Sequence, residues 1–193
     1  KLEASQPESE KKTPSSVLMQ MVMGRLYHEQ EKYKQAAKRF LHVLDALENA
    51  DDFGLKPEMR GVLLGDAAES YVIFGESFLG AGMIDKAQEA FRTAHEVDRD
   101  KNAQAFHQAR ILLAQDKAKQ AREELKKYFD AKADGQGAKP YELLEEVLTK
   151  LGKKDELTSQ LAEIQAGDQD NLPLAHFLAE HYQQEGQTAK AVP

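Results

Sequence analysis

Apolar residues recur at intervals of three and four along the chain from Val17 onward, and polar residues fill the positions between them. One clear run is Leu143, Leu144, Val147, Leu148 and Leu151. This period is typical of an amphipathic helix, whereas a half-buried strand alternates between apolar and polar at every residue. The pattern therefore predicts an all-α protein.

Short stretches rich in glycine, proline, aspartate or asparagine interrupt this pattern and predict the ends of the helices. They fall at 51–57, 80–82, 98–102, 133–140, 152–154, 167–173 and 185–187. The spacing between them leaves room for helices of roughly 12 to 16 residues, close to the usual length in globular proteins.

The first residues, 1–16, differ from the rest in composition. They read KLEASQPESEKKTPSS, with mixed charge and a single leucine. Such a segment has too little apolar surface to offset the entropy lost on ordering. We expect a disordered leader or linker here, and an arm that becomes ordered against a neighbour is the alternative.

Residues of similar size recur with a spacing of about 34 positions, which is the mark of a helical repeat. In a unit that begins at Ala68, Gly75 and Phe91 occupy positions 8 and 24, and Gly24 and Phe40 occupy the same positions in a unit that begins at Val17. Small residues at such positions allow paired helices to approach closely, and large residues fill the space around the contact. Comparable units begin near residues 17, 68, 102, 138 and 172.

These residues resemble the tetratricopeptide repeat (TPR), a helix–turn–helix unit of 34 residues. The resemblance covers residues 17–193, although Trp is absent from every position 4 and Glu145 replaces a small residue in the fourth unit. It implies a right-handed α-solenoid in which stacked helix pairs share one continuous core. A helical bundle without repeats is the alternative fold.

The first two units are separated by an insertion at 51–67. Its apolar residues, among them Met59 and Val62, continue the stripe of the helix that follows. We expect a lengthened first helix in the second unit, preceded by a loop that Phe53 and Leu55 hold in place. The insertion then serves either local packing or contact with a partner.

The last unit stops at Pro193, before its second helix would be complete. Solenoids need a polar cap over their final apolar face. We therefore expect an exposed face that includes Leu178 and Tyr182, in a fragment of a longer repeat protein or in a homo-oligomer that covers this open C-terminal face.

Composition adds mainly exclusions. The chain has no cysteine, which excludes disulfides, thiolate ligands and a cysteine nucleophile. Its net charge of −7 disfavours non-specific binding to nucleic acid. No apolar run approaches the roughly 18 residues of a membrane span. For location we favour the cytoplasm, and a secreted or periplasmic mature form stays open.

Three sets of residues suggest chemistry, and each has a plainer interpretation. His176 and Glu180 share a helix face at a spacing that can hold a metal ion, but surface polar residues show the same spacing. Residues 80–82, Gly-Ala-Gly, lack the preceding strand of a phosphate loop, so we expect a turn between helices. The basic residues between Lys117 and Lys132 are interrupted by acidic ones and predict a solvated helix face. We therefore expect no catalytic, cofactor-binding or metal-ligating residue.

In the family that the chain resembles, the first helix of each unit lines a concave groove that binds a partner. Carried over position by position, the partner-binding groove consists of Met21, Arg25, Glu69, Val72, Glu76, Phe106, Arg110, Glu142, Glu146, His176 and Glu180. Arg25 and Arg110 are candidates for pairing with carboxylates, and the acidic residues of the fourth unit favour a basic or amphipathic segment.

Some members of that family clamp the terminal carboxylate of a peptide with Lys, Asn and Arg side chains. The corresponding positions here hold Met21, Arg25, Ile73, Ala103 and His107. Because this set does not match the clamp, the sequence disfavours a ligand held by its carboxyl terminus.

The sequence therefore predicts a non-enzymatic scaffold for protein–protein interaction that binds peptide or helical segments in its groove, without cofactor or nucleic acid. A structural module that self-associates is one alternative. An accessory domain of an enzyme whose catalytic part lies outside these residues is another.

Overall fold

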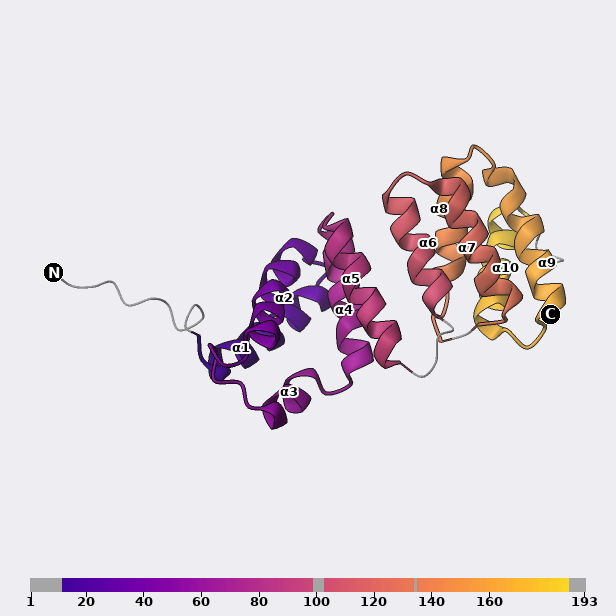
Figure 1. Cartoon of the computed structure of the whole chain (residues 1–193). Helices are drawn as coiled ribbons and strands as arrows, with labels where there is room; N and C mark the ends of the chain where they lie inside the picture. Colours follow the sequence, from indigo (N-terminus) through magenta and orange to yellow (C-terminus); the bar gives the residue numbers. More distant parts are fainter. Residues whose placement is uncertain (1–11, 99–102, 134, 188–193) are drawn as a thin grey trace. The chain divides into compact units, whose positions relative to one another are not determined.

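The computed structural model describes residues 12–98, 103–133 and 135–187, and within them it contains ten α-helices and no strand (Figure 1). This confirms the all-α class. The chain divides into two compact units, Lys1–Arg99 and Asp100–Pro193. The boundary falls inside the stretch 98–102, where the sequence predicts a break.

The first unit is built from two helix pairs and a short connecting helix. Its elements are α1 (Pro14–Glu29), α2 (Tyr33–Glu48), α3 (Pro57–Leu64), α4 (Ala67–Gly80) and α5 (Ile84–Val97). Helix α1 packs on α2 and α4 packs on α5, while α2 also packs on α4 and so joins the two pairs. The turn between α4 and α5 lies at 81–83, one residue later than the predicted turn at 80–82, and Gly80 is the last residue of α4.

Helix α1 begins earlier than the predicted end of the leader at Ser16. The Thr13 hydroxyl accepts a hydrogen bond from the Ser16 backbone N–H at 3.2 Å, and the Ser16 hydroxyl accepts one from the Thr13 N–H at 3.4 Å. This reciprocal capping, with Pro14 in the first turn, satisfies N–H groups that have no partner within the helix. The expectation for 13–16 was therefore wrong, and residues 1–11 lie outside the described part of the chain.

Two glycines let the helix pairs of the first unit approach closely. A Cβ atom added to Gly75 on α4 would lie 2.6 Å from Cε1 of Phe91 on α5, and one added to Gly24 on α1 would collide with the Phe40 ring on α2. Both rings are buried. The sequence predicts that small residues let paired helices approach closely. In these two pairs the small residue is a glycine, and it lies under a phenylalanine ring of the other helix.

The insertion contains a separate short helix, α3, that ends before α4 begins, so the prediction of one lengthened helix was wrong. Gly65 ends α3 with a φ of 61°, a left-handed conformation that glycine adopts at little cost. The Asp66 carboxylate then accepts a hydrogen bond from the Glu69 N–H at 2.9 Å and caps α4. Before α3, Phe53 and Leu55 are buried, so they hold the loop in place as predicted.

The second unit continues the succession of helices. Its elements are α6 (Gln104–Ala114), α7 (Ala118–Asp130), α8 (Lys139–Lys150), the short 3-10 helix η2 (Lys154–Glu156), α9 (Leu157–Gly167) and α10 (Leu172–Gln184). Helix α6 packs on α7, α7 on α8, α8 on α9 and α9 on α10. One cluster of buried side chains, which includes Phe106, Leu125, Leu148 and Leu161, runs through the unit.

Helix α10 does not leave the predicted apolar face open. Leu178 is only 7% exposed, because α9 packs against α10 and brings Leu178 into the core cluster. Tyr182 packs against the same cluster and is half-buried. The expectation that Leu178 lies on an exposed end face was therefore wrong, and residues 188–193, where the sequence predicts the start of another helix, lie outside the described residues.

Candidate functional site

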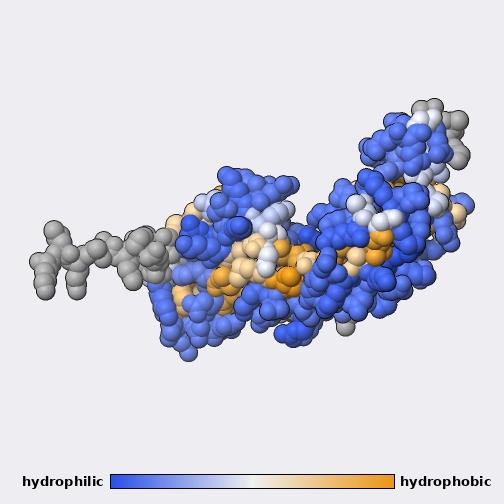
Figure 2. All heavy atoms as spheres, turned by 90° about the horizontal axis from the view of Figure 1, so that it is seen from above, coloured by the Kyte–Doolittle hydropathy of each residue, from blue (hydrophilic) through white to orange (hydrophobic). Residues whose placement is uncertain are grey.

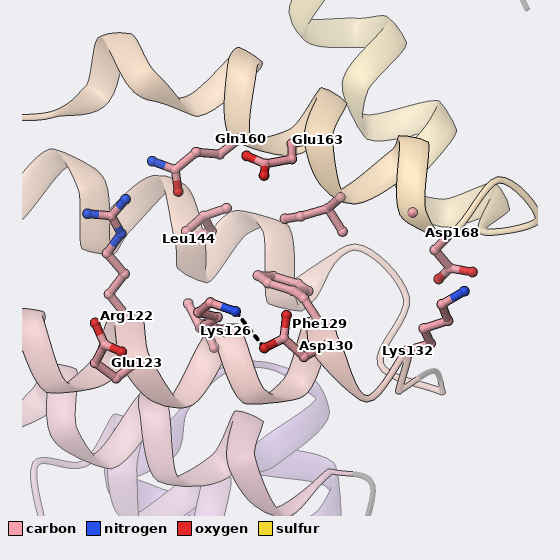
Figure 3. A pocket seen from close by; sticks show the side chains of 13 residues that line it. Arg122, Glu123, Lys126, Phe129, Asp130, Lys132, Leu144, Gln160, Glu163 and Asp168 are labelled. Carbon is pink, nitrogen blue, oxygen red and sulfur yellow. Dashed lines mark hydrogen bonds and ion pairs between the residues drawn. The ribbon is translucent and has the colours of Figure 1, made fainter.

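The second unit contains a cavity of about 680 Å³ between α7 and α9, which we call the slot. Its walls carry charged and polar side chains, and apolar side chains form its floor (Figure 3). The polar lining consists of Arg122, Glu123, Lys126, Asp130, Lys132, Gln160, Glu163 and Asp168. The apolar lining consists of Leu125, Phe129, Leu144 and Ile164.

The two walls of the slot run in the same direction. At one end the Arg122 guanidinium lies 3.5 Å from the Glu156 carboxylate, which immediately precedes α9. At the other end Lys132 follows α7 and Asp168 follows α9, and in Figure 3 these two side chains extend toward each other. Because a helix rises about 1.5 Å per residue, the eight-residue steps from 122 to 130 and from 160 to 168 give a length of about 12 Å.

The floor of the slot is held by the core of the unit. Leu125 and Leu144 are buried, and Phe129 and Ile164 are half-buried and present part of their surface to the slot. The Phe129 ring stacks on Tyr141, with ring centroids 5.7 Å apart and planes within 10°. A stacked, packed ring gives the slot an apolar floor with a fixed shape.

A short hydrogen-bond chain fixes the end of the slot at Asp168. The Asn171 amide donates to the Asp168 carboxylate at 2.9 Å, and the Asn171 carbonyl oxygen accepts from the Tyr141 hydroxyl at 3.0 Å. The same oxygen accepts from the Leu174 N–H at 3.0 Å and so caps α10. Burial raises the pKa of Tyr141, and the nearby Asp168 charge adds to this, while the Asn171 hydrogen bond opposes it.

The cationic side chains of the slot have acidic partners. Lys126 lies 2.6 Å from Asp130 on the same helix, and Arg122 pairs with Glu156. Hydrogen bonding to Asp130 raises the pKa of Lys126, and the charges of Glu123 and Glu163 contribute in the same direction. The Lys126 ammonium therefore lies within the field of carboxylates from both walls.

In the first unit, several predicted groove residues are engaged within the protein. Arg25 donates to the Ser70 hydroxyl at 2.7 Å and to the Leu64 carbonyl at 3.4 Å. Glu76 lies 3.5 Å from the His28 ring, so it too is held at the seam between α1 and α4. These contacts hold the helices of the unit together. They use the same polar groups that the sequence analysis assigned to a partner.

Two predicted groove residues belong to the core, which corrects their assignment. Met21 is 2% exposed because it lies one turn after the buried Val17, on the face of α1 that packs on α2. Phe106 is 1% exposed and packs against Tyr128 of α7, with ring centroids 5.9 Å apart. Of the remaining first-unit positions, Glu69 is exposed and Val72 is half-buried.

The last four predicted groove residues share one face of the second unit. Tyr141 and Phe177 lie 5.8 Å apart by ring centroids, and one turn later Glu145 lies 3.9 Å from His181, so α8 and α10 run side by side in the same direction. The exposed residues that follow the α8 contacts and precede the α10 contacts therefore point to the same side. They form what we call the inner row, Glu142, Glu146, His176 and Glu180.

Arg110, the other predicted cation, lies over the Phe106 ring at 5.6 Å on α6. The proposed metal pair, His176 and Glu180, lies 3.6 Å apart on the exposed face of α10. Within the described residues, no group of three or more His, Cys, Asp or Glu side chains is placed to hold a metal ion.

The residues of the slot were absent from the sequence-based site. The basic stretch from Lys117 to Lys132 was interpreted as a solvated face, but one side of it forms a wall of the slot. The pattern itself offered a signal. Arg122 and Lys126 are four residues apart, and Gln160 and Glu163 are three residues apart, so each pair lies on one face of its helix. What it lacked was the position of α9 across from α7, which depends on packing over α8.

In the part of the chain that the structure describes, every helix is too short or too polar to cross a lipid bilayer. No family model matches the chain, and no curated protein matches it either.

Proposed function

We propose that the chain is a TPR-like array, a right-handed α-solenoid of stacked helix pairs, that binds short segments of other proteins without catalysing a reaction. Two features support the array. The helices follow one another as antiparallel pairs joined by tight turns, and in two pairs the same repeat positions hold a glycine under a phenylalanine, Gly24 with Phe40 and Gly75 with Phe91. Solenoids of this kind present extended surfaces to ligands.

The observation that supports binding best is the slot. A cavity of about 680 Å³ lies in the range of ligand sites, which combine an apolar lining with a few placed polar groups. Phe129 and Ile164 offer apolar surface at its floor, and the side chains of two parallel helices line its sides. A peptide that fills the slot buries apolar surface that is otherwise in contact with water.

The inner row is a second surface for the same function, because its four predicted groove residues are exposed and share one face. Its acidic members Glu142, Glu146 and Glu180 favour a basic segment. Because the inner row lies on α8 and α10 and the slot lies between α7 and α9, substitutions can test the two surfaces separately.

The test is selection of binders from a phage-displayed library of random peptides of about 12 residues, with the whole chain as target. We expect a family of related peptides whose binding, measured by fluorescence anisotropy, falls at least tenfold in Ile164→Ser or in Glu142→Gln/Glu146→Gln. Circular dichroism of each variant checks that it folds. Selection of no related peptides, or of peptides that bind all variants equally, would contradict the proposed function.

A self-associating module is a second candidate, because apolar side chains of the insertion are exposed. Val62 on α3 is 79% exposed, and Met59 lies on the same helix and is also exposed. Figure 2, seen from above, shows that apolar surface, drawn in orange, also lies exposed amid hydrophilic surface on another face of the molecule. Light scattering of the chain and of Val62→Asp decides this: a monomer at all concentrations in both removes self-association through α3.

A further inference from the structure

We propose that the slot selects an amphipathic segment that places an apolar side chain on the slot floor and a lysine or arginine between Glu123 and Glu163. This inference rests on the proposed function and specifies the partner that the slot accepts. It assigns a ligand chemistry to residues that the sequence pattern marks only as a solvated helix.

The apolar half of the specificity comes from the floor. Phe129 of α7 and Ile164 of α9 both line the slot and are half-buried, and the buried Leu144 of α8 lines it as well. Stacking on Tyr141 fixes the Phe129 ring, so the floor offers a pre-formed surface and loses little side-chain freedom when a ligand covers it. The slot length of about 12 Å matches about two turns of a helix, since one turn rises about 5.4 Å.

The charged half of the specificity comes from the carboxylates left over after the cations of the slot are paired. Arg122 is paired with Glu156 and Lys126 with Asp130. Among the described residues, no hydrogen bond or ion pair engages the carboxylates of Glu123 on α7 and Glu163 on α9. Because Glu156 also pairs with Lys153, it neutralises Arg122 only in part. The slot lining has four carboxylates and three cations, so one negative charge is left over, and Glu123 and Glu163 are the lining carboxylates without a partner in the described part of the chain.

The Lys126 ammonium supports this balance independently. Its pKa is raised chiefly by the hydrogen bond to Asp130, whose carboxylate lies 2.6 Å away, and the charges of Glu123 and Glu163 contribute in the same direction. The three carboxylates carry three negative charges, and the Lys126 ammonium supplies one positive charge. A second cation, supplied by a ligand, completes the neutralisation.

At the far end, Lys132 and Asp168 lie opposite each other and leave no net charge between them (Figure 3). The charge asymmetry therefore runs along the slot, with excess acid toward Glu123 and Glu163 and neutrality toward Lys132. An amphipathic segment that carries its base at one end of an apolar pair meets this asymmetry in one direction only.

The experiment uses the peptides selected from the random library against the whole chain. We expect the selected peptides to carry Lys or Arg beside apolar residues spaced three or four apart. We expect Glu123→Gln/Glu163→Gln to weaken binding of the labelled peptides about tenfold and to flatten its dependence on salt. The matched control is Glu29→Gln/Glu58→Gln, which makes the same charge change on exposed side chains of the first unit, outside both the slot and the inner row, and leaves binding unchanged.

The outcomes separate this inference from the proposed function. Peptides that lose binding in Ile164→Ser but are neutral or acidic, or are indifferent to Glu123→Gln/Glu163→Gln, overturn the inference and leave a peptide-binding function standing. Peptides that lose binding only in the inner-row variant also overturn it and place the ligand on α8 and α10. Selection of no peptides overturns both.

Discussion

Replacement of Gly75 by alanine tests the packing that joins α4 to α5. The added Cβ would meet three atoms of the Phe91 ring, at 2.6, 2.7 and 2.9 Å, where ordinary contacts lie beyond 3.4 Å. The ring cannot swing into solvent because Phe91 is buried. The helices must therefore separate, or the ring must leave its preferred rotamer.

The expected magnitude follows from two opposing terms. Overpacking a filled core costs about 1–3 kcal/mol, and we take about 3 because the Cβ approaches several ring atoms at once. Alanine is favoured over glycine inside a helix by about 1 kcal/mol. The variant should therefore lose about 2 kcal/mol of unfolding free energy. For a unit of this size, this loss lowers Tm by roughly 8–16 °C.

Urea unfolding followed by circular dichroism measures this difference, and Gly61→Ala is the matched control. Gly61 lies in α3 of the same unit, is exposed, and has no atom within 4 Å of an added Cβ. This variant should gain about 0.5–1 kcal/mol, because only the helix preference acts. The double variant Gly75→Ala/Phe91→Leu should be less destabilised than the sum of its single changes, since leucine lacks the ring atoms that the Cβ meets.

The reasoning fails if Gly75→Ala is as stable as the wild-type chain, or if the two alanine variants change stability in the same direction by similar amounts. Either result would mean that the glycine under Phe91 does not set the distance between α4 and α5. The recurrence of glycine and phenylalanine at equivalent positions would then be no argument for closely packed repeat units.

Three further predictions concern the loop, the cap and pH. Phe53→Ala should destabilise the first unit by about 3 kcal/mol in urea unfolding, because it empties a buried ring site beneath the insertion. Asn171→Ala should cost about 2 kcal/mol, since it removes the cap of α10 and the acceptor of the buried Tyr141 hydroxyl, whereas Asn171→Ser, which keeps a capping oxygen, should cost less. Burial raises the pKa of Tyr141, so the unfolded chain releases this proton first, near its ordinary pKa of 10.0. Stability should therefore be intact below pH 10 and fall as pH rises above it, and urea midpoints between pH 8 and 11 should fall less steeply in Tyr141→Phe.

Several elements could be predicted from the sequence because local patterns specify them. The turn between α4 and α5 follows to within one residue from the glycines at 80 and 82, and the buried anchors Phe53 and Leu55 follow from apolar residues inside a polar loop. The break at Gly65 was missed because the apolar stripe continues across it. A stripe reports which face is buried, but it does not report the left-handed φ of one glycine or the capping by Asp66.

The binding surfaces were harder to predict, since a repeat position does not determine how exposed a side chain is. Met21 and Phe106 occupy groove positions in the repeat numbering but lie in the core. The polar groups of Arg25 and Glu76 contact Ser70 and His28 within the protein. Glu142 and Glu146 of the inner row are exposed because none of the described helices covers them, and their role in binding stays a prediction.

The sequence by itself determined the helical class, most helix ends and the small-under-large contacts between paired helices, because these depend on residues a few positions apart or on a fixed repeat spacing. Tertiary structure alone decided that α7 and α9 flank α8 and leave a slot between them, that Lys126 and Arg122 find partners there, and that Glu123 and Glu163 do not. The physical reason is that a helix pattern fixes the direction of a side chain about its own axis, whereas the distance to another helix depends on how all the intervening side chains pack.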